Sequence, residues 1–183
     1  MTLAPAPNPK MSLNADGWLE RGAYYNVYNC ASAGCLGGNA TTFPQSPIAA
    51  GGSIVAWTGS QTDSGVSELY RLIAFPAGTT TVQVLIDTNF QTKSTATTNH
   101  DYFEVRLLDS SQVQIGAPLI ALSNTTAQTG TAHAWTKDVT MTPRDLSAFA
   151  GKPGYLVLWT SVDTSLRSDF FVDNVRLIAT VCK

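Results

Sequence analysis

Hydrophobic and polar residues alternate along much of the chain in short segments, and this two-residue period predicts β-strands rather than helices. The alternation is cleanest in residues 80–90 and 101–109, each of which has one hydrophobic and one polar face. The hydrophobic positions of these two segments are Val82, Val84, Ile86, Phe103, Val105 and Leu107. Both segments predict antiparallel strands that cover a core with one face and meet water with the other.

Eight further segments combine β-branched, aromatic and aliphatic residues between turn signals, which predicts more strands. They are residues 14–22, 24–29, 48–58, 68–75, 113–122, 133–141, 155–162 and 168–178. Residues 113–122 contain a Gly and a Pro, so this strand is expected to be bent or to lie at an edge. Residues 143–150 predict a short helical turn, and no segment predicts a long helix. Eight to ten strands should therefore form an all-β, two-sheet antiparallel sandwich.

The last predicted strand, residues 168–178, carries a carboxylate where a core residue is expected. Strict alternation places four of its residues on one face: Phe171, Asp173, Val175 and Leu177. A buried carboxylate needs a partner, and a bound cation is one candidate. The plainer alternative is that Asp173 accepts hydrogen bonds from a loop, or pairs with Arg167 or Arg176.

The bulk composition is that of one β-rich domain. The chain has 183 residues, of which 13% are charged and 44% hydrophobic, and its formal net charge is −2. Nucleic acid and anionic membranes are not expected partners, because this charge offers no basic surface. No run of apolar residues is long enough to predict a membrane-spanning helix. Residues 1–10 predict a Pro-rich linker and residues 11–183 a single domain, which we expect to belong to a larger secreted protein.

The spacing of the cysteines does not decide whether they form a disulfide, and with the histidines they form no recognisable zinc motif. Cys30, Cys35 and Cys182 allow three different single disulfides. Cys30 and Cys35, separated by Ala-Ser-Ala-Gly, are expected either to close a small loop or to be free together with Cys182. His100 and His133 add no standard zinc spacing. The cysteines permit an oxidising compartment without requiring one.

The sequence carries no catalytic motif of the kinds Gly-x-Ser-x-Gly, His-Glu-x-x-His or Gly-rich phosphate loop. We therefore expect no enzymatic activity. One alternative stays open, a glycosidase carboxylate pair made of Asp101 and Glu104, because the distance between two carboxylates cannot be read from sequence.

Two sets of residues are candidates for ligand binding. Tyr24, Tyr25 and Tyr28 suit stacking on sugar rings, since a phenol combines an apolar face with a hydrogen-bonding group; a role in the core or on a strand face is the alternative. Glu104 and Arg106, on the polar face of their strand, are candidates for lining a binding surface, and a cross-strand ion pair is the plainer account. Three tryptophans within predicted strands are expected in the core: Trp57, Trp135 and Trp159.

Several motifs together resemble a known group of modules. These are Gly-Gly-Ser-Ile-Val-Ala-Trp, Leu-Tyr-Arg-Leu-Ile-Ala-Phe-Pro-Ala-Gly-Thr, Asp-Tyr-Phe-Glu-Val-Arg-Leu-Leu-Asp, Asp-Leu-Ser-Ala-Phe-Ala-Gly-Lys and Phe-Phe-Val-Asp-Asn-Val-Arg-Leu. Their order over residues 14–178 resembles the jelly-roll accessory modules of secreted bacterial proteins, which include galactose-binding-like, MAM-like and carbohydrate-binding β-sandwiches. The resemblance implies a jelly-roll fold, but modules of this kind bind sugars, bind proteins or only space domains.

The resemblance also implies a structural calcium ion that ties the first strand to the last. Carried onto this sequence, its ligands are Glu20, the backbone of Ser53, and Asp173. Leu19 stands where the family usually has an aromatic residue, so Asp16 is the alternative donor from the first strand. Calcium suits such a site because it accepts six to eight oxygen ligands in flexible geometry.

The sequence and the resemblance together lead to one main hypothesis. The chain is expected to be a non-catalytic, secreted or cell-surface module with a structural calcium, and its ligand a glycan or cell-surface polysaccharide. The alternative is a structural or adhesive spacer domain that binds protein or nothing.

Overall fold

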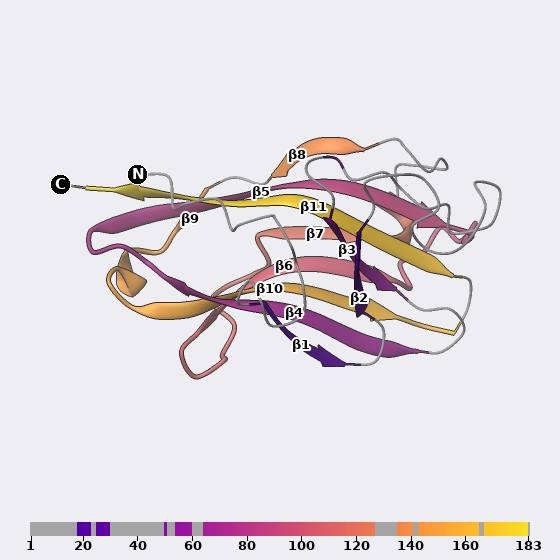
Figure 1. Ribbon diagram of the computed structural model, residues 1–183, viewed down its shortest axis with the longest axis horizontal. Coiled ribbons are helices and arrows are strands. Elements are labelled where there is room, and N and C mark those ends of the chain that lie inside the picture. Colours follow the sequence, from indigo (N-terminus) through magenta and orange to yellow (C-terminus); the bar gives the residue numbers. More distant parts are fainter. Residues whose placement is uncertain are drawn as a thin grey trace.

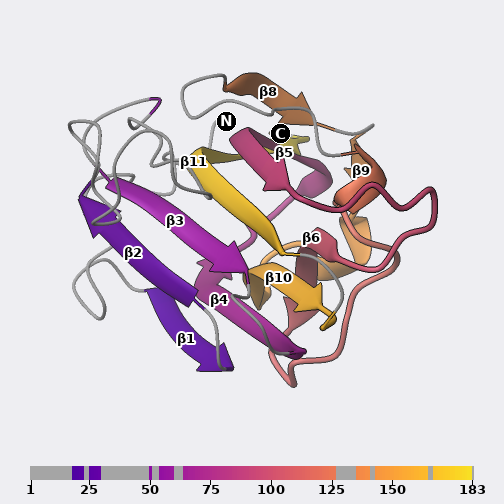
Figure 2. The same ribbon diagram turned by 90° about the vertical axis from the view of Figure 1, so that its right-hand side faces the viewer.

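The computed structural model describes residues 18–22, 25–29, 50, 54–59, 64–126, 135–140, 143–164 and 167–182, and of residues 20, 22, 25–29, 54 and 59 only the backbone. Within these ranges lie eleven β-strands and two short 3-10 helices, η1 (Asn124–Thr126) and η2 (Ser147–Phe149). Figure 1 and Figure 2 show the strands in two layers packed face to face. The predicted all-β, two-sheet antiparallel jelly-roll β-sandwich is confirmed, with one strand more than the upper expectation.

One sheet has five strands, in the order β1-β4-β10-β6-β7. They are β1 (Trp18–Gly22), β4 (Gly65–Ala74), β10 (Pro153–Val162), β6 (Tyr102–Asp109) and β7 (Ile120–Ser123). All neighbours in this sheet pair antiparallel. The predicted strand at 113–122 is reduced to the short edge strand β7, which fits the expectation of a bent or edge segment.

The other sheet has six strands, in the order β2-β3-β11-β5-β8, with β9 also paired to β5. They are β2 (Tyr25–Asn29), β3 (Ile54–Gly59), β11 (Ser168–Val181), β5 (Thr79–Thr92), β8 (Thr136–Thr140) and β9 (Arg144–Asp145). The helical turn predicted at residues 143–150 is the pair of β9 and η2. In the described part of the chain no helix is long and apolar enough to cross a membrane.

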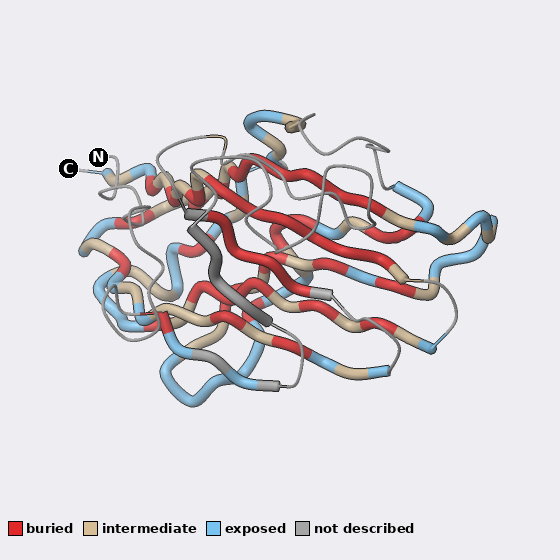
Figure 3. Tube along the Cα trace, turned by 45° about the vertical axis from the view of Figure 1, so that its right-hand side comes forward, coloured by how far each residue is buried: buried red, intermediate tan, exposed pale blue. Residues whose placement is uncertain are grey.

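The core fills the space between the two sheets with alternate residues of their central strands. Phe90, Phe103 and Phe170, from β5, β6 and β11, meet there with ring centroids 4.7–5.9 Å apart. Each of these rings is almost wholly buried, and Figure 3 shows buried residues along the central strands of both sheets. Aromatic pairs in this geometry add about 0.5–1.5 kcal/mol each beyond the burial of their area.

A β-bulge in β11 overturns the predicted alignment of Asp173. The register with β5 shifts between Asp173 and Arg176, and Asn174 adopts a left-handed backbone with φ 49°. Before the bulge the core residues of β11 are even-numbered, and after it they are odd-numbered. The predicted common face was therefore wrong: Phe171, Asp173, Val175 and Leu177 do not share it. Asp173 is buried, at 2% exposure, but outside the core between the sheets.

Of the tryptophans expected in the core, Trp57 is buried, at 9% exposure, whereas the expectation is wrong for Trp159. Trp57 is buried but points away from the core, where it stacks with Phe171 and donates a hydrogen bond to Asp169. Trp159 is half-buried and projects outward from β10. Trp135 is half-buried beside β8, and Trp18 instead belongs to the core, at 3% exposure. The reason is that strand alternation, not residue type, decides which face a side chain takes.

Candidate functional site

The outward surface of the five-stranded sheet brings charged and aromatic side chains from four strands together. Leu69, Val105 and Leu158 face the core, so the residues that alternate with them project from the opposite face. The strand register aligns these projecting residues in rows. One row contains Arg21, Glu68, Trp159 and Glu104, and the next contains Leu19, Tyr70, Val157 and Arg106. We call the following set the Trp159 face: Arg21, Glu68, Tyr70, Glu104, Arg106, Tyr155 and Trp159.

Two ion pairs flank Trp159 on this face. Arg21 Nε lies 2.5 Å from Glu68 Oε2, and Arg106 Nε lies 2.6 Å from Glu104 Oε2. Arg21 is 56% exposed, whereas the other three side chains are only 15–22% exposed. The hydrogen bond and charge of Glu68 raise the pKa of the Arg21 guanidinium above its ordinary value. Each arginine is therefore held next to a glutamate by an ion pair.

The aromatic rings of the face lie against these cations. The Arg106 guanidinium carbon sits 3.6 Å from the centroid of the Trp159 ring, and that of Arg21 lies 5.7 Å from the Tyr70 ring. Tyr70 packs edge-on against Tyr155, with centroids 5.9 Å apart. Val157, beneath them on the same side of β10, is 1% exposed. The rings and guanidinium groups thus form one continuous layer over the sheet.

The loop between β6 and β7 reaches this layer from one side. Gln112 at its tip accepts a hydrogen bond of 3.4 Å from Arg21 Nη1, so the loop contacts the opposite edge strand β1. Leu72 and Leu19, at 58% and 44% exposure, extend the apolar surface beside Tyr70. The result is an exposed sheet face with apolar rings, donors and acceptors side by side.

Of the sequence-predicted ligand residues, Glu104 and Arg106 lie on the Trp159 face. Their ion pair joins positions two apart on β6 and is not the expected cross-strand pair. Tyr25 and Tyr28 lie in β2 of the other sheet, where only their backbone is described, and Tyr24 lies outside the described residues. A sugar-binding role for these tyrosines stays a prediction.

The remaining residues of the Trp159 face were not predicted to bind ligand. Tyr70, Tyr155 and Trp159 occupy the outward positions of two predicted strands, with hydrophobic residues between them. That alternation was the available signal. It was missed because an aromatic residue in a hydrophobic strand is usually assigned to the core.

The predicted calcium ligands are divided between the two sheets. Glu20 lies in β1, with only its backbone described, and Asp173 lies in β11; Ser53 and Asp16 fall outside the described residues. Asp173 pairs in register with Asp87, which is also buried, and its Oδ1 accepts a hydrogen bond of 2.7 Å from the Asn174 backbone. Among the described residues no group of three or more His, Cys, Asp or Glu is placed to hold a metal.

Two neighbouring buried carboxylates nevertheless present the hard oxygen donors that calcium prefers, although both oxygens of Asp87 also accept hydrogen bonds, from the Asp138 backbone and from Asn174 Nδ2. The donor chemistry of Asp173 and Asp87 therefore fits calcium. The calcium site itself stays a prediction.

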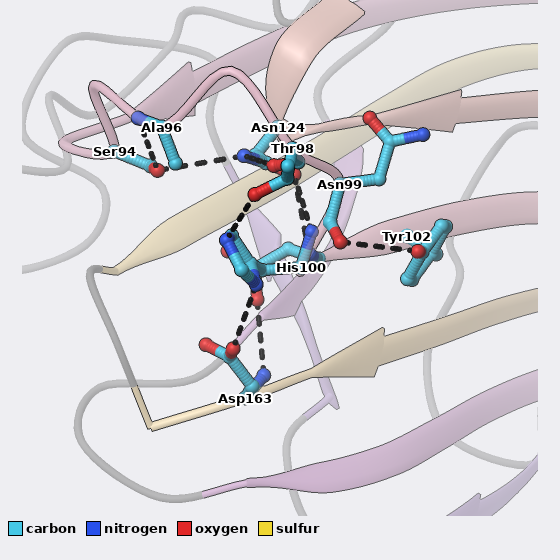
Figure 4. A network of polar contacts seen from close by, with 9 residues as sticks. Ser94, Ala96, Thr98, Asn99, His100, Tyr102, Asn124 and Asp163 are labelled. Carbon is cyan, nitrogen blue, oxygen red and sulfur yellow. Dashed lines mark hydrogen bonds and ion pairs between the residues drawn. The ribbon is translucent and has the colours of Figure 1, made fainter.

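A polar network closes the end of the sandwich where β6 begins and β10 ends (Figure 4). The Oδ1 of Asn124 accepts hydrogen bonds from the backbone N–H of His100 (2.9 Å) and Asp101 (3.3 Å), and its Nδ2 donates to the Thr98 carbonyl. His100 Nδ1 lies 3.4 Å from the Asp163 carboxylate. Asn124 is 4% exposed, so its side-chain amide serves to hold this end of the sandwich together.

The same network rules out the open catalytic alternative. Asp101, directly before β6, is 1% exposed, and its Oδ1 accepts a hydrogen bond from the Asp163 backbone. Glu104 projects outward from β6. The two carboxylates cannot flank one glycosidic bond, so the Asp101–Glu104 pair was wrong as a glycosidase pair.

Asp169 is a further buried acid, which was not predicted from the sequence. Asp169 is fully buried and accepts hydrogen bonds from Trp57 Nε1 (2.7 Å) and from Arg167 Nε and Nη2 (2.7 and 3.0 Å). Burial raises the pKa of Asp169 to about 6, although Arg167 and Trp57 act to lower it. The Asp169 carboxylate joins β3 to β11 through the Trp57 indole.

Known proteins similar to this chain are found by structure and not by sequence. No protein-family model matches the sequence, and no curated protein matches it. Solved structures do match. TmCBM61 in complex with β-1,4-galactotriose has a TM-score of 0.53 at 12% identity, with 89% of this chain and 88% of that chain covered. The chain has the β-sandwich fold of carbohydrate-binding modules.

Two enzyme structures contain the same fold. A cyclase from Fischerella sp. TAU has a TM-score of 0.50 at 17% identity, covering 91% of this chain and 86% of that one. The α-L-arabinofuranosidase MgGH51 has a TM-score of 0.53 at 12% identity, and 96% of this chain covers 25% of that enzyme. At these identities the similarity concerns the fold alone.

Proposed function

We propose that the chain is a non-catalytic, extracellular glycan-binding module and that the Trp159 face is its binding surface. The observation that carries the proposal is the juxtaposition of outward-pointing, half-buried aromatic rings with ion-paired arginine and glutamate side chains on one sheet face. The structure with this fold that contains bound β-1,4-galactotriose adds support from outside the chain.

The chemistry of the face matches that of a sugar polymer. A pyranose ring has an apolar face that packs on an aromatic ring and hydroxyl groups at its rim that both donate and accept hydrogen bonds. Tyr70, Tyr155 and Trp159 supply the apolar contact, and the flanking Arg and Glu side chains supply donors and acceptors held in place by their ion pairs. From β1 to β6 the face crosses three strand spacings, about 14 Å, which suits an extended ligand better than a single sugar.

We also propose the structural calcium as part of this function, with Asp173 as a ligand. The buried pair of Asp173 and Asp87 supports it, because two neighbouring carboxylates gain from a shared cation. The ion would stabilise the fold and take no part in ligand contact, since these residues lie in the sheet opposite the Trp159 face.

A glycan array followed by titration calorimetry tests the binding function. The wild-type chain should bind at least one glycan, and Trp159→Ala should weaken that binding tenfold or more, which corresponds to about 1.4 kcal/mol. Trp135→Ala, directly before β8 of the other sheet, is the matched control and should bind like wild type. An array without any bound glycan would favour the spacer function instead, whereas full affinity in Trp159→Ala would refute the Trp159 face as the binding surface.

A further inference from the structure

The Trp159 face carries no net charge, although it is rich in charged groups. Its two cations, Arg21 and Arg106, each contact an anion, Glu68 or Glu104, at 2.5–2.6 Å. The glutamates lie on either side of Trp159 in the same cross-strand row, and the Arg106 guanidinium covers one face of the indole, so a ligand group on this row lies between two carboxylates. No position on the row offers a cation without an anion beside it.

The polar atoms left for a ligand are mixed in kind. Arg106 uses Nε for Glu104, and within the described residues its two Nη groups have no hydrogen-bond partner. Glu104 and Glu68 each use Oε2 for an arginine. Free donors therefore lie a few ångströms from free acceptors. A hydroxyl group, which donates and accepts, satisfies both at once, whereas a carboxylate or sulfate only accepts.

We infer that the Trp159 face selects neutral glycans and discriminates against glycans that carry uronate or sulfate groups. The inference rests on the proposed glycan-binding function and names the ligand class of that site. On binding, an acidic sugar would lose the hydration of its anionic group. Glu68 and Glu104 would then repel that group, and this repulsion offsets its attraction to Arg106.

The test uses a pair of polymers with the same sugar backbone, one charged and one neutral: polygalacturonate and its fully methyl-esterified form, beside a neutral β-1,4-galactan and an array of neutral and acidic glycans. Wild-type protein should bind neutral glycans with an affinity that changes less than twofold between 50 and 500 mM NaCl, and should bind each acidic glycan at least tenfold more weakly than its neutral counterpart.

Variants that remove the negative charges of the face test whether the glutamates cause the selection. Glu68→Gln with Glu104→Gln keeps the shape of the face and leaves two unbalanced cations, so acidic glycans should gain tenfold or more in affinity and their binding should become salt-sensitive. Glu104→Gln alone should give a smaller shift in the same direction. The matched control is Asp145→Asn, which changes the charge by one unit at an exposed position of strand β9 of the other sheet and should leave the neutral-to-acidic ratio unchanged.

The outcomes separate the two proposals. Wild-type preference for acidic glycans that is lost in Trp159→Ala would overturn the charge selection and leave the glycan-binding function intact. An array without binding to any glycan would overturn the function and the selection with it. An unchanged neutral-to-acidic ratio in both Gln variants would also overturn the selection, because the carboxylates would then have no part in it.

Discussion

The buried acid Asp169 allows a sharp test of whether desolvation or ion pairing controls its charge. Burial raises the pKa of its carboxyl from the ordinary 3.8 to about 6, against the opposing effects of Arg167 and Trp57. At about 1.36 kcal/mol per pKa unit, this difference corresponds to about 3 kcal/mol between the two protonation states. The magnitude is large because Asp169 is fully buried and solvent does not screen it.

The sign of the resulting pH dependence follows from proton binding. Between pH 3.8 and 6 the folded state holds the Asp169 proton more tightly than the unfolded state does. The contribution of this group to stability is therefore fully present below pH 3.8 and is lost as the pH rises through about 6. The free energy of unfolding should fall by about 3 kcal/mol from this group alone.

Asp169→Asn isolates this contribution, because Asn is neutral at every pH and keeps one acceptor oxygen. Urea unfolding at several pH values between 3.5 and 7.5, followed by tryptophan fluorescence, gives the free energy of unfolding of both proteins. The wild-type value minus the variant value should decrease by about 3 kcal/mol across this range. Only this difference isolates Asp169, since every other titrating group contributes equally to both proteins.

Asp145 is a control of opposite sign. Hydrogen bonds from Ser147 lower its pKa, so the stability it contributes is present above pH 3.8 and is lost as the pH falls below that value. A wild-type minus Asp169→Asn difference that is flat, or that rises with pH as for Asp145→Asn, would refute the reasoning. It would show that the Arg167 ion pair, and not burial, determines the charge of Asp169.

Three further predictions concern stability. Gly78→Ala should lower the unfolding free energy by at least about 1 kcal/mol in urea titrations, because Gly78 has φ +78° and an added Cβ would lie 2.5 Å from the Cys182 carbonyl; Gly151→Ala, with φ +75° and an open surrounding, should cost less. Asn124→Ala should cost about 2–4 kcal/mol in the same assay, since it leaves two backbone N–H groups without their acceptor, while Thr125→Ala should cost under 1 kcal/mol. Addition of a chelator should lower the melting temperature of wild type but not that of Asp173→Asn, if calcium is bound at Asp173; equal shifts in both proteins, or no shift in wild type, would contradict that ligand.

The fold was predictable because alternation survives in almost every strand. Val82, Val84 and Ile86 face the core as their period predicts, and so do Phe103, Val105 and Leu107. The prediction failed at Asp173, where one extra residue in the bulge inverts the faces of the rest of β11. A single bulge leaves no clear mark in composition. Asn174 was the one hint, because asparagine adopts the left-handed backbone more readily than most residues.

The candidate site was much less predictable, because its members become neighbours only through strand register. Arg21, Glu68, Trp159 and Glu104 are up to 138 positions apart in sequence, Arg21 to Trp159, yet they occupy one row. A register slip of one residue in β10 would turn Trp159 into the core and expose Leu158 in its place. Alternation alone therefore identifies Glu104 and Arg106 as outward residues of one strand, while the charge balance and the aromatic layer are properties of four strands together. The same dependence makes the register itself testable, because a Glu68→Cys, Glu104→Cys double variant brings its two thiols to either side of Trp159 only in this pairing.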